Sequence, residues 1–159
     1  MPDITYRPIG TIHSPFKEAE GTPIQSSASQ VQGTIEVFPE FVAGLKDLDG
    51  FSHIILLYHF HRSRKPELVV KPFMDVESRG VFSIRAPSRP NSIGFSVVRL
   101  LKIDGNLLYV EGLDILDGTP LLDIKPYVPK FDSVKAERIG WLEDNVSKVE
   151  SARDDGRFG

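Results

Sequence analysis

Two arginines near the middle of the chain, Arg85 and Arg89, lie four residues apart in a segment that proline stiffens. Because proline fixes its own φ at about −65° and restricts the residue before it, Pro87 and Pro90 order this segment before any ligand arrives. A guanidinium group offers a planar fork of N–H donors that fits a carboxylate or a phosphate. We therefore predict an anion-binding loop, in which Asn91 supplies further hydrogen bonds. The alternative is that both arginines only brace loops by pairing with the carboxylates of Asp114, Asp117 or Asp123.

A second polar segment, residues 114–127, holds those three carboxylates together with Lys125 and Tyr127. Gly118 and Pro120 indicate a turn within it. Carboxylates on a rigid turn suit a pair of ribose hydroxyls, an ammonium or a sulfonium group, and a tyrosine ring can stabilise a cation. A pair of acids that catalyses hydrolysis has the same composition, and turn formation alone explains the glycine and the proline.

Three histidines lie close together in the sequence, at His53, His59 and His61. On an extended strand His59 and His61 share a face, as two metal ligands would, but a metal site normally needs a third ligand. We therefore expect packing or capping roles for His53 and His59, and no metal site. His61 begins the basic run 61–65 at a strand end, where ligands are commonly bound, and we expect it to be functional.

The composition is that of one soluble globular domain. The 159 residues are 40% hydrophobic and 26% charged, and no apolar run is long enough for a membrane helix. The start of the chain lacks a signal-peptide pattern, and the absence of cysteine suits the cytoplasm and excludes thiolate chemistry. The net charge is −3, yet residues 62–102 carry nine basic and three acidic side chains. This local basic field favours a small anionic ligand, such as one that bears phosphate.

Proline and glycine recur between β-branched stretches through the first 130 positions, which indicates short strands and long loops. The motifs of nucleotide-binding sheets, G-x-G-x-x-G and Walker A, are missing, as are zinc patterns. We predict a mainly β protein, a small closed or strongly curved β-barrel rather than a Rossmann fold. The expected strands are 6–13, 33–38, 54–60, 81–84, 95–103, 107–111 and 113–116, with a short helical turn over 41–48.

The hydrophobic period changes after Asp132. Ile139, Leu142, Val146 and Val149 recur with helical spacing, and Ser133 is a suitable N-cap. The sequence therefore predicts a C-terminal helix over about 134–152, packed against a single barrel domain whose core spans about 5–133.

Five ordered segments together resemble the TsaA/TrmO family, and the resemblance runs from about residue 9 to 133. These segments are PIGTIHSPFK, TPIQ, GFSHIILLYHFHRS, GVFSIRAPSRPNSIGFS and DILDGTPLLDIKPYVP. The resemblance implies a cytoplasmic methyltransferase that uses S-adenosyl-L-methionine. Its substrate would be N6 of N6-threonylcarbamoyladenosine beside the tRNA anticodon. It also implies a β-barrel that works as a homodimer, with the cofactor cleft between subunits.

The candidate residues form two groups: the cofactor contacts that the resemblance implies, and the catalytic residues that we infer from the chemistry of such a methyl transfer. The cofactor would contact Pro23, Ile24, Gln25, His61, Arg62, Arg85, Phe95, Asp114, Ile115, Leu116 and Asp117. The catalytic group comprises Asp117 or Asp123 as proton acceptor, Lys125 and Tyr127 as hydrogen-bond donors, and Arg89 with Asn91 for the anions of the substrate. The alternative function is a non-catalytic barrel that binds adenosylmethionine or RNA.

Overall fold

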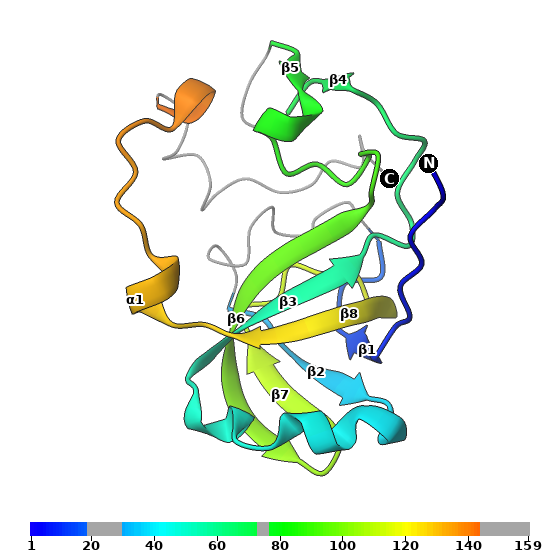
Figure 1. Ribbon diagram of the computed structural model, residues 1–159, viewed down its shortest axis with the longest axis vertical. Helices are drawn as coiled ribbons and strands as arrows, with labels where there is room; N and C mark the ends of the chain where they lie inside the picture. The colour runs from blue at the N-terminus through cyan, green and yellow to red at the C-terminus, as the bar shows by residue number, and fades with distance from the viewer. Residues whose placement is uncertain (19–29, 73–76, 144–159) are drawn as a thin grey trace.

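The computed structural model describes residues 1–18, 30–72 and 77–143, and within them six antiparallel strands close into a barrel (Figure 1). The order around the barrel is β1-β2-β7-β6-β3-β8, and β8 pairs with β1 to close it. The strands are β1 (Gly10–His13), β2 (Gln32–Val37), β3 (His53–His59), β6 (Ile93–Asp104), β7 (Leu107–Glu111) and β8 (Thr119–Pro126). The predicted fold class, mainly β and barrel-shaped rather than Rossmann, is confirmed.

The barrel interior is a packed apolar core. Alternate residues of each strand point inward, and Ile12, Ile35, Leu56, Leu108 and Leu121 are each completely buried there. The hairpin predicted at residues 104–107 joins β6 to β7, with Gly105 at φ 61° as the first turn residue. Only glycine adopts that angle at little cost, so the turn fixes the register of the two strands.

The two ends of the barrel differ. Short 3-10 helices at Pro39–Leu45 and Leu48–Gly50 lie across one end, at the bottom of Figure 1, where Leu48 joins the core and Phe41 packs against it. At the opposite end β1, β3 and β7 finish while β2, β6 and β8 begin, so loops converge there. We call this the open end.

A small excursion beyond the open end carries Arg85. The hairpin β4 (Val69–Val70) with β5 (Arg79–Gly80) lies at the top of Figure 1 and leads into a 3-10 turn, Val81–Ser83. Val70, Val81, Ile84 and Ala86 form a second, smaller core, against which Trp141 packs. Arg85 therefore stands between two buried residues of a separate core, which fixes where its backbone lies.

Two of the predicted strands were wrong. Residues 81–84 form the 3-10 turn instead of a strand, because Ser83 Oγ donates to the carbonyl of Gly80 at 2.7 Å and stabilises a turn. Residues 113–116 form no strand, because Gly112 at φ 99° turns the chain away and the Ile115 carbonyl accepts from Ser14 Oγ.

The predicted C-terminal helix does not begin at residue 134. The helix α1 is the short Pro129–Asp132, and only the 3-10 turn Gly140–Leu142 follows it in the described part of the chain. Val134 and Ile139 are exposed, so no packing supports a helix there, and Gly140 has φ 61°. Residues 144–152 lie outside the described residues. No helix in the described ranges is long and apolar enough to span a membrane.

Candidate active site

The carboxylate of Asp117 is held by charge at the open end. Lys17 Nζ donates to Oδ2 at 2.7 Å, the backbone N–H of Ser14 donates to Oδ1 at 3.0 Å, and His13 Nδ1 lies 3.8 Å from Oδ1. The hydrogen bond from Lys17 is the main cause that lowers the pKa of Asp117, followed by that from Ser14. Asp117 is therefore ionised at neutral pH and a weak proton acceptor.

Backbone pairing explains why Asp117 meets this segment. The N–H of Asp117 donates to the Phe16 carbonyl at 2.7 Å, and that of Gly118 donates to the Ile12 carbonyl at 2.8 Å. Gly118 has φ 82°, which a side chain would disfavour. The turn before β8 is thus attached to the end of β1, and Asp117 faces residues 13–17.

His61 borders the same turn through Thr119. The Thr119 hydroxyl donates its one proton to the Leu116 carbonyl at 2.6 Å, and His61 Nδ1 lies 3.4 Å from Thr119 Oγ1. Because that hydroxyl proton is already used, His61 Nδ1–H is the donor and Nε2 carries the lone pair. Partial burial, then the charges of Arg62 and His59, lower the pKa of His61. The ring is consequently neutral at physiological pH and can accept a proton at Nε2.

Arg62 joins the two segments of this cluster, since its guanidinium donates to the carbonyl of Lys17. Arg62 therefore links the loop after β3 to the loop after β1. The Lys17–Asp117 ion pair links that same loop to the turn before β8.

A second carboxylate, Asp114, is held by hydroxyl groups. Ser96 Oγ donates to Asp114 Oδ1 at 2.7 Å, and Tyr58 OH lies 2.8 Å from Ser96 Oγ. Ser96 and Tyr58 are buried, while Asp114 is half-buried. Nearby, the Arg85 guanidinium carbon lies 6.0 Å from the centre of the exposed Phe95 ring. Asp114 and Arg85 both act electrostatically on the buried Tyr58 hydroxyl and form the second half of the site, while Phe95 is exposed on the outer face of β6.

Arg89 braces its own loop. Its Nη1 donates to the carbonyls of Ile84 and Ala86, at 3.0 and 3.2 Å. Arg89 thus braces a loop, as the alternative to anion binding predicted. Its partners, however, are backbone carbonyls rather than the carboxylates of Asp114, Asp117 or Asp123. Asn91, two residues after Arg89, is exposed. The backbone carbonyl of Asn91 accepts a hydrogen bond from the backbone N–H of Ile93 at 2.8 Å.

Three of the predicted catalytic residues lie apart from the Asp117 cluster. Asp123 and Lys125 form an ion pair of 2.8 Å on β8, and Tyr127 contacts His53 edge-to-face with 6.3 Å between ring centres. The hydrogen bond and charge of Asp123 raise the pKa of Lys125. At about 3.3 Å per residue, Asp123 lies roughly 13 Å along the strand from Thr119 at the open end.

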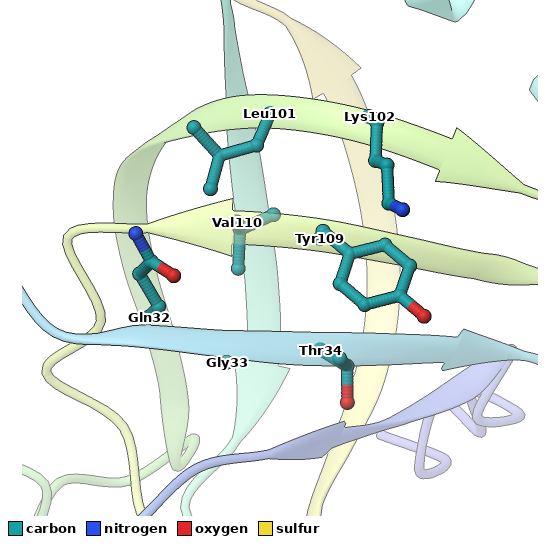
Figure 2. Close-up of a pocket in the computed structure, with 7 residues that line it drawn as sticks. All are labelled: Gln32, Gly33, Thr34, Leu101, Lys102, Tyr109 and Val110. Atoms are coloured by element: carbon teal, nitrogen blue, oxygen red, sulfur yellow. The ribbon is translucent and has the colours of Figure 1, made fainter.

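A shallow hollow of about 440 Å³ lies on the outer face of β2, β7 and β6 and holds none of the predicted site residues (Figure 2). Its lining includes Gln32, Thr34, Leu101, Lys102 and Tyr109. The Lys102 ammonium lies 4.6 Å from the centre of the Tyr109 ring, so one ring face is already occupied.

The structure brings together eight of the predicted residues at the open end and leaves others elsewhere. The eight are His61, Arg62, Arg85, Phe95, Asp114, Ile115, Leu116 and Asp117. The side chain of Ile115 is part of the barrel core. Pro23, Ile24 and Gln25 lie outside the described residues.

Sequence reasoning assigned no role to six residues that complete the site: His13, Ser14, Lys17, Tyr58, Ser96 and Thr119. All six belong to the segments that carried the family resemblance, which was the available signal. The predicted shared face of His59 and His61 was wrong, because β3 ends at His59 and His61 lies in a turn. No group of three potential metal ligands occurs in the described ranges.

Fold and site define a closed antiparallel barrel that gathers cations, two carboxylates and a neutral imidazole at one end. Residues 11–133 match the family model of the tRNA-methyltransferase O N-terminal domain, and the chain belongs to this family. The family resemblance stated from the motifs is confirmed.

Relatives agree with this assignment. A probable S-adenosyl-L-methionine-binding protein of Pyrococcus abyssi is 64% identical over 98% of this chain and 85% of its own length. A tRNA (adenine(37)-N6)-methyltransferase of Rattus norvegicus is 38% identical over 79% of this chain, which spans 31% of that enzyme. The crystal structure of TrmO from Pseudomonas aeruginosa superposes with a TM-score of 0.74 at 42% identity, covering 87% of this chain and 62% of that one.

Proposed function

We propose that this protein transfers a methyl group from S-adenosyl-L-methionine to N6 of N6-threonylcarbamoyladenosine beside the tRNA anticodon. The observation that carries the proposal is the placement of Asp114, His61 and Asp117 at the open end of a barrel of this family, with Arg85 on the adjoining excursion. The names of the relatives support the cofactor, and that of the rat enzyme supports a tRNA adenine as substrate.

The chemical groups at the open end fit the cofactor. Asp114 and Asp117 offer acceptors for ribose hydroxyls or an ammonium, Arg62 and Arg85 offer donors for a carboxylate, and the exposed Phe95 ring offers an apolar face. When bound, S-adenosyl-L-methionine supplies an electrophilic methyl group. The residues of this chain then align the acceptor nitrogen, which is the main contribution that a rigid site makes to such a transfer.

The nitrogen that gains a methyl group must lose its proton, and His61 is the best acceptor among the described residues. Asp117 is ion-paired with Lys17 at 2.7 Å and its pKa is lowered, which weakens it as a base. Asp123 is ion-paired with Lys125 at 2.8 Å on β8, away from the open end. His61 is neutral, and its tautomer leaves Nε2 ready to accept. Arg89 and Asn91, on the adjoining loop, are proposed to meet the carboxylate and phosphates of the substrate.

A second copy of the chain is proposed to complete the cofactor site in the cytoplasm. The outer face of β3 and β6 is apolar: Ile93 and Phe95 are 44% and 47% exposed, and Leu57 pairs with Phe95. Phe95 and Arg85 lie at this face, so the copy that covers it would also enclose the cofactor. Ile93→Asp should therefore give a monomer in light scattering with weakened cofactor binding; a dimer with unchanged affinity would contradict this assembly.

Methyl transfer to defined tRNA tests the proposal. Purified protein with labelled S-adenosyl-L-methionine should methylate tRNA that carries threonylcarbamoyladenosine and leave the same tRNA without that modification unlabelled. Mass spectrometry of the nucleosides identifies the product, and Asp114→Asn should lose activity while Ser63→Ala retains it.

The alternative is a non-catalytic binding module, as the name of the Pyrococcus abyssi relative, a probable S-adenosyl-L-methionine-binding protein, would allow. Cofactor binding without transfer to either tRNA would support this alternative and refute the enzyme.

A further inference from the structure

Two buried hydroxyl groups connect the barrel core with Asp114. Tyr58 is 4% and Ser96 2% exposed, and their oxygens lie 2.8 Å apart; Ser96 Oγ then lies 2.7 Å from Asp114 Oδ1. Neither residue lies at the surface where a ligand would bind. We infer that Tyr58 and Ser96 form a one-way hydrogen-bond relay that positions the Asp114 carboxylate for the methyl donor.

The direction of the relay follows from counting protons. An ionised carboxylate only accepts hydrogen bonds, so Ser96 donates its single hydroxyl proton to Asp114. Ser96 Oγ therefore accepts in its contact with Tyr58, whose hydroxyl is the donor. Burial, and secondly the negative charge of Asp114, raise the pKa of Tyr58 far above its usual value, so the hydroxyl keeps its proton.

Strand pairing fixes the Tyr58 ring in place. Tyr58 on β3 pairs with Gly94 on β6, and a Cβ at Gly94 would lie 2.1 Å from the Cε2 atom of the ring. Only glycine leaves room for the ring in this register. Phe60 contacts the ring edge-to-face at 5.5 Å between centres. Since the ring cannot shift, its hydroxyl has one position, and so has the Ser96 hydroxyl that it contacts.

This relay provides Asp114 with a fixed orientation on a segment without regular secondary structure. Asp114 lies in the loop between β7 and β8, where no strand pairing holds its backbone. A hydrogen bond to a charged group is worth more than one between neutral groups, about 1.5–3 kcal/mol. The role of Asp114 towards the methyl donor rests on the proposed function; the hydrogen bonds that position it do not.

Calorimetric titration with S-adenosyl-L-methionine, together with thermal unfolding, tests the relay in three variants. Ser96→Ala removes the donor to Asp114 and leaves the buried Tyr58 hydroxyl without a partner. We expect the Kd to rise roughly tenfold or more and the Tm to fall. Tyr58→Phe keeps the ring and should raise the Kd only a few-fold.

The double variant Tyr58→Phe/Ser96→Ala separates positioning from stability. It removes both hydroxyls, so no buried hydroxyl is left without a partner, and the Tm should recover towards that of the wild type. The Kd should stay as high as in Ser96→Ala, because the hydrogen bond from Ser96 to Asp114 is still missing. A Kd that recovers together with the Tm would show a merely structural role and overturn the relay.

Ser63→Ala is the matched control, since among the described residues Ser63 Oγ bonds only neutral groups, the Phe60 carbonyl and Ser92 Oγ. Its Kd should equal that of the wild type. If the wild type itself binds no S-adenosyl-L-methionine, the proposed function fails. If the wild type binds and Ser96→Ala binds equally well, only the relay fails.

Discussion

Asp114 and Asp117 lie three residues apart in one loop, and the protein holds their carboxylates by opposite means. Asp117 is held by the ammonium of the exposed Lys17 at 2.7 Å and by the backbone N–H of Ser14 at 3.0 Å. Asp114 is fixed by a buried serine and tyrosine. Charge pairs in water are weak and exchangeable, whereas buried hydroxyl networks are rigid and intolerant of change.

The difference suggests a division of work within the site. A carboxylate held by an exposed lysine can exchange that partner for a cationic ligand, because both states are solvated. A carboxylate oriented from the core keeps its position whether a ligand is bound or not. We therefore expect the carboxylate of Asp117 to change partners when a ligand binds, and that of Asp114 to keep its position. We call these the adaptable side and the fixed side of the site.

The largest expected effect lies beside Asp117, at His61. His61→Gln should lower the rate of methyl transfer about a hundredfold, because a positioned base contributes at least that much. In the wild type the rate should fall as the pH decreases through the lowered pKa of His61, below about 6.5, because protonated His61 cannot accept a proton.

Single-turnover rates from pH 5 to 8 measure this dependence. The charged or titratable groups that act on the pKa of His61 are Arg62 and His59. His59→Gln is the control and should keep the acid limb. An acid limb that persists in His61→Gln would exclude His61 as the base.

Gly94→Ala should have the second largest effect, a loss of stability on the Asp114 side of the site. The added methyl group would overlap the Tyr58 ring, and overpacking of this kind costs about 1–3 kcal/mol of unfolding free energy. Denaturant unfolding measures it. Gly44→Ala places a methyl group in open space and should change stability by less than about 0.5 kcal/mol. Equal stability of the two variants would refute the tight packing under Tyr58.

Asp117→Asn should have a smaller and pH-dependent effect. The folded-state pKa of Asp117 is lowered, so its stabilising contribution is present above the unfolded value of about 3.9 and disappears as the pH falls through the folded value. At pH 7 we expect a loss of at most about 1 kcal/mol, and at pH 2 to 3 a smaller difference from the wild type. A difference that grows on acidification would contradict the lowered pKa.

Salt provides the finest test of the comparison. Lys17→Ala should cost a few tenths of a kcal/mol at low ionic strength and almost nothing at 1 M salt, where the Debye length is about 3 Å. The loss of stability in Ser96→Ala should not depend on salt, because a buried hydroxyl is not screened. If both variants respond to salt equally, the two carboxylates are not held by different means.

Sequence patterns predicted the barrel because strand alternation and the glycine turn at Gly105 act locally. They also located His61, Asp114 and Asp117, through a family resemblance that the matching family model supports. The relay was out of reach, because it depends on β3–β6 register and on the turn at Gly112, which bring Tyr58, Ser96 and Asp114 together across 56 positions.

The helix predicted from residue 134 is the converse case, in which a local pattern predicted an element that the structure does not form there. Ile139 and Leu142 have helical spacing, but periodicity does not provide a surface to pack against. In the described part of this segment, Trp141 packs against the smaller core. The Trp141 indole N–H donates to the Ser83 carbonyl at 2.8 Å, a contact with the excursion that no local pattern encodes.

The most direct test of the central claim, that the open end of the barrel is the methyl-donor site, is a crystal structure with S-adenosyl-L-methionine bound. The account predicts contacts from the donor to Arg85, Asp114 and His61, with the Ser96 hydrogen bond to Asp114 intact. A donor bound without touching these three residues, for example in the hollow between Gln32 and Lys102, would contradict it.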